Sequence, residues 1–216
     1  MLYKNLVKKF ESNSTSDLKV RGFTLIELLI VIAILAILAT VVLLVINPVQ
    51  MFAQARDSQR IYDLNTLSNA TALYLTTVVS PDLSGSGAFA CGTTYGASVT
   101  GATTEYFTAA DTIWTSFTGA IDGTGWVPVD YADITGGSPL SALPKDPTNT
   151  VASTYYYTYS CNNTSPNEWF EFDALMESCR YGHSNCAAGA AGTDDVEATD
   201  GGDQDNVYEV GNYLSL

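Results

Sequence analysis

Residues 21–46 read RGFTLIELLIVIAILAILATVVLLVI, and this stretch decides the architecture of the N-terminal part of the chain. Leu28 to Ile46 are 19 consecutive positions, of which only Thr40 is polar. As a helix that rises ~1.5 Å per residue, this run is about 28 Å long, close to the ~30 Å hydrocarbon thickness of a bilayer. Apolar residues occupy every angle around the helix axis, whereas a helix docked on a soluble domain has a polar stripe. The stretch predicts a membrane span, with a fully buried core helix as the alternative.

Charge is distributed unevenly on the two sides of this span. The chain has 9 basic and 23 acidic residues, a net charge of −14, and five of the basic residues lie in the first 22 positions. Positively charged flanks stay in the cytoplasm, so we expect the N-terminus inside and the chain from Asn47 onward outside. The acidic remainder repels phosphates, which excludes a nucleic-acid partner. With a single histidine and no catalytic motif, we expect no enzyme.

An acidic residue, Glu27, stands at the entrance of the span. Together with the glycine at position 22, the apolar Phe23 and the long apolar run, it resembles the class III signal of type IV prepilins and the related pseudopilins. The resemblance implies that a prepilin peptidase cleaves between Gly22 and Phe23, on the cytoplasmic side, and methylates the new amino terminus of Phe23. Many pilins have a proline within the apolar run, whereas here Pro48 follows its end.

Glu27 also has a physical reason to serve assembly. An acid within a membrane span is costly and tends to be functional. Four residues from the new terminus, Glu27 can neutralise the amine of a neighbouring subunit, where two unpaired charges would otherwise lie in an apolar bundle of helices. The alternative is an interfacial acid favoured by the dipole at the helix N-terminus.

Three segments follow from these patterns. We expect a leader at residues 1–22, a membrane-spanning and then amphipathic helix at residues 23–80, and an extracytoplasmic globular head at residues 81–216. Apolar positions recur at three- and four-residue steps from Ile61 to Val78, with Arg56, Asp57, Arg60 and Asp63 on other faces, so one side of this half is expected to be wetted. Proline at position 81 ends the pattern.

The head predicts an antiparallel sheet of three or four strands. Tyr155–Ser160 and Glu168–Leu175 alternate aromatic and polar residues around a turn and predict a hairpin, and Asn206–Val210 can add a third strand. Residues 82–139 predict a loop-rich insertion with a short helix near 109–117 and a short edge strand at 126–130. The fold class is therefore α+β and pilin-like, with the long N-terminal helix packed on this sheet.

Four cysteines lie beyond the span, where disulfides persist, and they permit three connectivities. Cys179 and Cys186 enclose a short loop and can meet locally. Cys161 is placed at the hairpin tip, far from Cys179, and is left for Cys91. We expect the pairs Cys179 with Cys186 and Cys91 with Cys161.

Residues 194–209 form an acidic loop before the final strand, and no lysine or arginine follows Arg180. Such a loop is self-repulsive unless its carboxylates are solvated or gathered round a cation. Calcium takes six to eight oxygen ligands in flexible geometry. The spacing of Asp200, Asp203 and Asp205 resembles the calcium loop of major pseudopilins, which implies these three as ligands. A solvated acidic loop is the alternative.

The resemblance implies a structural pilin, a subunit of a type IV pilus-like helical filament for adhesion, motility or secretion. Its expected location is the cytoplasmic membrane as a single-pass precursor and then a filament on the cell surface. Expected partners are further copies of the chain, other pilins, the prepilin peptidase, and the membrane through Leu28–Ile46. The alternatives are a pseudopilin of a type II secretion system and a membrane-anchored binding protein that never polymerises.

Overall fold

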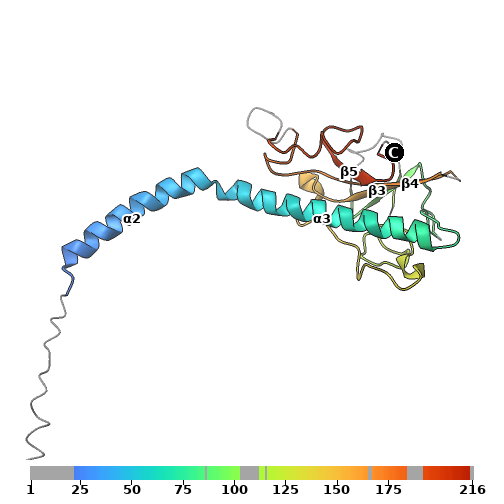
Figure 1. Ribbon diagram of the computed structural model, residues 1–216, viewed down its shortest axis with the longest axis horizontal. Coiled ribbons are helices and arrows are strands. Elements are labelled where there is room, and N and C mark those ends of the chain that lie inside the picture. The colour runs from blue at the N-terminus through green and yellow to red at the C-terminus, as the bar shows by residue number, and fades with distance from the viewer. Residues whose placement is uncertain are drawn as a thin grey trace, which may run out of the picture. The chain divides into compact units, whose positions relative to one another are not determined.

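The computed structural model describes residues 22–85, 87–102, 112–114, 116–164, 167–183 and 192–214. The chain divides into two compact units, Met1–Ile46 and Asn47–Leu216. The first contains helix α2, and the second contains helix α3 and a five-stranded sheet (Figure 1). The predicted α+β class is confirmed.

Helix α2 spans Leu25–Ile46 and has no polar stripe. Its described large apolar side chains are all between 50% and 81% exposed. Thr40 donates its hydroxyl hydrogen to the carbonyl of Ile37 at 2.8 Å, so the polar residue is satisfied within the helix. Residues Leu25–Leu43 are long and apolar enough to cross a membrane. The helix is therefore a candidate span whose apolar surface is left for lipid or other helices to cover.

Asn47 interrupts the predicted helix of residues 23–80. Its φ of 45° and ψ of 75° lie in the left-handed region, and Pro48 begins helix α3 (Pro48–Thr77). Proline has no N–H to donate and disfavours helix at the preceding residue, which explains why the break falls at this position. Two helices thus stand where the pattern predicted one, and the second ends at Thr77, three residues before the predicted boundary.

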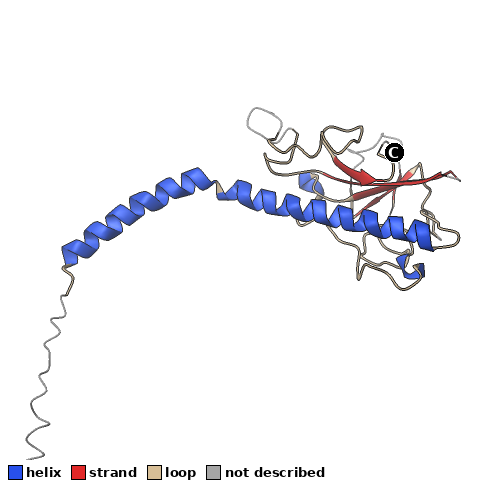
Figure 2. Cartoon of the chain, in the orientation of Figure 1, coloured by secondary structure: helices blue, strands red, loops and turns tan. Residues whose placement is uncertain are grey.

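The sheet of the head has the strand order β2-β1-β3-β4-β5. Strands β1 and β2 are parallel, and the other neighbours are antiparallel. The strands, drawn in red in Figure 2, are β1 (Thr94–Ala97), β2 (Thr112–Ile113), β3 (Thr158–Thr164), β4 (Asn167–Ala174) and β5 (Tyr208–Gly211). The predicted hairpin is β3 and β4, and the predicted third strand is β5, but β1 and β2 make the sheet larger than predicted.

The insertion differs from its prediction in two places. Thr112 and Ile113 pair with β1 as a strand, so the short helix predicted near 109–117 is wrong there; residues 109–111 and 115 lie outside the described residues. Residues 126–130 form no strand beyond a single bridge between Asp130 and Asp122. Trp126, Val127 and Val129 are fully buried. Isolated aromatic residues in a Gly-rich stretch predict a loop, but in the structure residues of this stretch, such as Trp126, are part of the hydrophobic core.

The core of the head lies between α3 and one face of the sheet. Helix α3 runs along the sheet in Figure 1, and its Leu64 and Leu67 are fully buried. Aromatic rings from the sheet and the insertion meet them: Tyr159 and Phe172 have centroids 5.1 Å apart, and Trp126 meets Phe172 edge-on at 6.3 Å. Aromatic alternation along β3 and β4 thus supplies one apolar face.

A disulfide links Cys91 to Cys161, the pair expected from the sequence. Cys161 lies within β3 opposite Phe170, not at the hairpin tip. Cys179 is also disulfide-bonded. Its expected partner, Cys186, lies outside the described residues.

Candidate functional site

The bond between Gly22 and Phe23 lies just before helix α2. Phe23 is 90% exposed, and no atom lies within 4 Å of the position where a Cβ of Gly22 would stand. Helical structure begins at Leu25. The predicted cleavage position is therefore in non-helical, exposed chain at the entrance of the apolar helix.

Thr24 and Glu27 close the first turn of α2 by reciprocal hydrogen bonds. Thr24 donates its backbone N–H and its hydroxyl to Glu27 Oε2, both at 2.8 Å, and the Glu27 N–H is donated to Thr24 Oγ1 at 3.2 Å. This is a capping box, which satisfies two N–H groups that a helix start would leave without a partner. The prediction for Glu27 missed this role, although threonine followed three residues later by glutamate is its sequence signal.

Residues 17–43 match the family model of the prokaryotic N-terminal methylation motif. The chain carries the class III signal of type IV pilin-like proteins. The motif supports a precursor of the type IV pilin-like or pseudopilin kind, proteins whose family is structural, and the signal with its apolar helix fits a membrane-anchored precursor. No curated protein and no solved structure matches the chain.

A buried arginine, Arg60, joins helix α3 to the rest of the head. The Arg60 side chain is 0% exposed and donates to both Asp146 oxygens, from Nε at 2.5 Å and from Nη2 at 3.1 Å. It also donates from Nη1 to Asp57 at 2.6 Å. Asp57 in turn accepts the backbone N–H groups of Glu177 at 2.8 Å and Ser178 at 2.7 Å. One guanidinium thus joins the helix, the turn that contains Asp146, and the segment after β4.

The side of α3 that carries Asp57, Arg60 and Asp63 was predicted to be wetted, and this is wrong. All three are buried, and Asp63 accepts the Tyr157 hydroxyl hydrogen at 2.9 Å. Burial raises the pKa of Asp63, although the bonds from Tyr157 and Gln59 act in the opposite direction. The segments that cover this side come from more than 80 residues downstream, so helical periodicity alone could not reveal them.

The sheet face opposite the aromatic core is acidic and also buried. Glu171 and Asp173 alternate with Phe170 and Phe172 along β4, and Glu209 on β5 lies directly opposite Asp173. One carboxylate oxygen from each of the three acids lies within 4.8 Å of the other two. Their exposed fractions are 3%, 4% and 2% for Glu171, Asp173 and Glu209. Sequence reasoning missed this cluster, because alternation does not tell whether the polar face meets water.

The pKa values of this cluster are displaced upward. Burial, with a smaller contribution from Glu209, raises the pKa of Asp173 to about 7, against the bond donated by Thr158. Burial and the neighbouring Glu171 raise the pKa of Glu209 to about 9. Both shifts express the cost of ionising carboxyl groups that share a buried site.

The structure does not bring the three predicted calcium ligands together. Asp200 accepts the N–H of Gly202 at 2.9 Å and the N–H of Glu209 at 2.7 Å, while Asp203 and Asp205 are exposed. Among the described residues, the group of acids with converging oxygens is Glu171, Asp173 and Glu209. Calcium at Asp200, Asp203 and Asp205 stays a prediction of the sequence.

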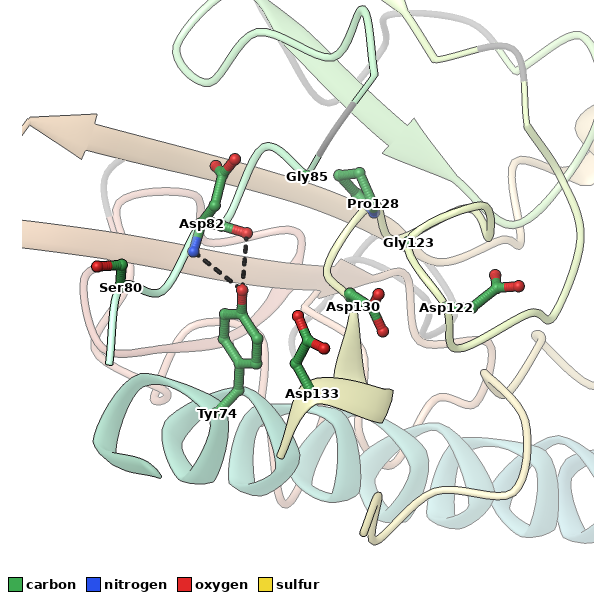
Figure 3. Close-up of a pocket in the computed structure, with 9 residues that line it drawn as sticks. All are labelled: Tyr74, Ser80, Asp82, Gly85, Asp122, Gly123, Pro128, Asp130 and Asp133. Carbon is green, nitrogen blue, oxygen red and sulfur yellow. Dashed lines mark hydrogen bonds between the residues drawn. The ribbon is translucent and has the colours of Figure 1, made fainter. Parts of the chain in front are cut away.

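A second acidic region lies near the C-terminal end of α3, in a pocket of about 200 Å³ (Figure 3). Tyr74 points toward Asp82 and exchanges hydrogen bonds with its backbone, accepting the N–H at 2.9 Å and donating to the carbonyl at 3.3 Å. Asp82, Asp122 and Asp130 each accept a backbone N–H from the residue two positions later. These carboxylates shape the loops around the pocket.

Proposed function

We propose that the chain is a structural subunit of a type IV pilus-like helical filament, made as a membrane-anchored prepilin. Residues 1–22 are the leader, residues 23–80 the stem and residues 81–216 the extracytoplasmic head. A prepilin peptidase cuts between Gly22 and Phe23, and Phe23 is N-methylated. The mature subunit leaves the cytoplasmic membrane, where Leu28–Ile46 anchors it, and joins further copies and other pilins on the cell surface.

The observation that carries this proposal is the methylation motif of residues 17–43, which overlaps a helix exposed on every side. Burial of apolar surface is favourable by ~25 cal/mol per Å². Every described large apolar side chain of α2 is at least half exposed, so we expect lipid or other helices to bury this surface. Lipid covers it in the precursor. In a filament, the α2 helices of neighbouring subunits cover it. A subunit therefore leaves the membrane only when it packs against other subunits.

Glu27 has two tasks in this proposal. Its Oε2 accepts both hydrogen bonds from Thr24, while Oε1 accepts none from the described residues. Cleavage creates a new cation, the methylated amine of Phe23. In a bundle of apolar helices the free oxygen of Glu27 neutralises the amine of a neighbouring subunit, since either charge alone would be left unpaired in an apolar environment.

Processing is tested by the mass of the mature chain. The protein is expressed with and without a prepilin peptidase and purified from membranes. The proposal expects loss of residues 1–22 and one added methyl group only when the peptidase is present. An intact N-terminus in the native host would reject the filament and favour a membrane-anchored binding protein that never polymerises.

Two matched variants separate the tasks of Glu27. Glu27→Gln keeps an acceptor for Thr24 but removes the charge, because glutamine also serves in a capping box. Thr24→Ala removes the cap and keeps the charge. We expect Glu27→Gln to be inserted and folded yet nearly absent from sheared filaments, and Thr24→Ala to assemble. The opposite result would limit Glu27 to capping the helix.

The same motif occurs in pseudopilins of type II secretion systems, so location decides between the two assemblies. Sheared surface fibres that contain this chain by mass spectrometry support a pilus. Loss of secreted proteins on deletion of the gene, without surface fibres, would assign the chain to a secretion machine.

A further inference from the structure

The acidic face of the sheet is a row of polar side chains across three strands. Thr158 and Ser160 on β3 pair with Asp173 and Glu171 on β4, and Glu209 on β5 pairs with Asp173. All five side chains are at most 4% exposed. A sheet face that only needed to be polar would face water, so the burial of this row calls for a physical reason.

Several oxygens in this row have no hydrogen-bond partner among the described residues. They are Asp173 Oδ1, Glu209 Oε1 and Ser160 Oγ. The other oxygens are used: Thr158 donates to Asp173 Oδ2 at 2.9 Å, and the Gln204 N–H is donated to Glu209 Oε2 at 3.1 Å. A buried polar atom without a partner costs about 1 to 3 kcal/mol, and more when it is charged, so two such carboxylate oxygens side by side point to a missing positive charge.

No basic side chain supplies that charge within the described part of the chain. The arginines already bind other acids. Arg56 binds Glu177, Arg60 binds Asp146, and Arg180 binds Asp194 in an exposed loop. Either protons shared between the carboxyl groups or a bound cation must balance the cluster.

The donor set selects the kind of cation. Carboxylate oxygens without nitrogen or sulfur suit hard cations such as calcium and magnesium. Magnesium keeps several bound waters, for which three almost fully buried carboxylates leave little access. Calcium accepts carboxylates in flexible, one- or two-oxygen geometry. One oxygen from each of the three acids lies within 4.8 Å of the other two, so three carboxylates can reach one ion.

We propose that Glu171, Asp173 and Glu209 bind one calcium ion that joins β4, β5 and the acidic loop of the head. This site differs from the loop ligands Asp203 and Asp205, and it is independent of filament assembly. Glu209 contacts the acidic loop at two places. Its Oε2 lies so close to Gly202 that a Cβ there would stand 1.8 Å away, and its backbone N–H is donated to Asp200 Oδ2. Calcium at the cluster therefore fixes the loop that precedes the last strand.

The experiment uses the full chain in detergent micelles, dialysed against chelator and then titrated with calcium. Equilibrium dialysis should find one calcium per chain. The melting temperature, followed by tryptophan fluorescence, should rise with calcium concentration as expected for a ligand of the folded state. Magnesium at the same concentration should give a clearly smaller rise.

Variants locate the ion. Asp173→Asn and Glu209→Gln should each weaken calcium binding by about 100-fold, because each removes one negative charge from the ligands of the ion. Gly202→Ala removes no carboxylate, but its Cβ displaces the Glu209 carboxylate, so it should also weaken binding. The matched controls Asp203→Asn and Asp205→Asn remove the same charge from the neighbouring loop and should leave the affinity unchanged.

Three results would overturn the proposal. They are a wild-type chain that takes up no calcium and melts identically in calcium and chelator, binding lost in the Asp203 or Asp205 variants but kept in Asp173→Asn, and equal stabilisation by magnesium. The first would leave shared protons as the balance of the cluster. The wild-type measurements decide the matter even if a cluster variant does not fold.

Discussion

Two clusters of buried carboxylates in the head differ in what balances their charge. Asp57 and Asp146 surround Arg60, and all three side chains are 0% to 1% exposed. Glu171, Asp173 and Glu209 are buried to a similar degree, but no lysine, arginine or histidine of the described chain forms an ion pair with Asp173 or Glu209. An arginine balances the first cluster, whereas Asp173 and Glu209 in the second each keep a carboxylate oxygen without a hydrogen-bond partner among the described residues.

The difference is informative because cations are scarce. After residue 22 the sequence has only Arg56, Arg60, Lys145 and Arg180 as basic residues. Arg56 and Arg60 bind acids that join α3 to the segments packed on it. Loss of this packing would unfold the head. The acidic sheet face receives none. Two of the few cations therefore stabilise the packing of α3 on the head without any ligand. In the proposal above, the acidic sheet face is balanced by a bound calcium ion.

The largest effect is expected from breaking the complete cluster. Arg60→Met keeps much of the side-chain volume but leaves Asp57 and Asp146 buried without a cation. We expect the free energy of unfolding to fall by about 3 to 5 kcal/mol. Chemical denaturation of the full chain measures it, and Arg56→Met is the control, since Arg56 is 35% exposed and binds only Glu177. Equal losses in the two variants would show that Arg60 is not the centre of the junction.

A smaller effect with a change of sign is expected at the incomplete cluster. In chelator, the Glu209 carboxyl must take up a proton to be buried, because its pKa is raised to about 9. Glu209→Gln replaces it with a neutral amide that offers an N–H₂ group to its neighbours, so stability should rise by about 1 to 3 kcal/mol. In saturating calcium the wild-type chain should be the more stable of the two. A variant that is less stable than wild type in both solutions would contradict an uncompensated cluster.

The same contrast explains what the sequence could predict. Gly22, Phe23 and the apolar run lie next to one another in the chain, and their signal is read from adjacent residues. The hairpin β3 and β4 is also local, because alternation and a turn specify it. The capping box of Thr24 and Glu27 could have been found by the same means.

Burial of charge was beyond such reasoning. Asp57 and Arg60 have the spacing of a solvated helix face, and only the return of Asp146 and Glu177 from far downstream covers them. Glu171 and Asp173 likewise alternate with aromatics as on any half-wetted strand. Pairing with Glu209 on β5 and the cover of residues 200–204 depend on contacts that local patterns do not encode.

Glu197 is a third kind of buried acid in the head. Backbone N–H groups bind its carboxylate, and no cation of the described chain forms an ion pair with it. It is 2% exposed and accepts the N–H groups of Met176 and His183, each at 2.6 Å. Burial raises its pKa from an ordinary 4.5 to about 7, with smaller upward contributions from Asp195 and Asp57. The folded state therefore holds the proton more tightly than the unfolded state, and the stability from Glu197 is full below pH 4.5 and is lost as the pH rises toward 7.

Between pH 5 and 6.5 the free energy of unfolding should fall as the pH rises, and Glu197 should contribute about 1 kcal/mol per pH unit of this fall, beside contributions of the same sign from Asp173 and Glu209. Glu197→Gln should make the slope shallower by that amount, whatever its absolute stability. The hydrogen bond with Asp195 raises the pKa of His183, so the stability that His183 contributes is complete below its ordinary pKa of 6.5 and is lost only above it, outside this window. An unchanged slope in Glu197→Gln would assign the pH dependence to other groups.

The smallest effect is expected where a pair is close but exposed. Arg180 Nη2 and Asp194 Oδ2 are 2.6 Å apart, and the two side chains are 48% and 51% exposed. Water screens both charges already, and holding two long side chains in one geometry costs conformational entropy. Arg180→Ala should therefore leave the unfolding midpoint of the full chain unchanged, in low salt and in high salt. A loss comparable to that of Arg60→Met would mean that scarcity of cations, and not burial, sets the value of each arginine in this chain.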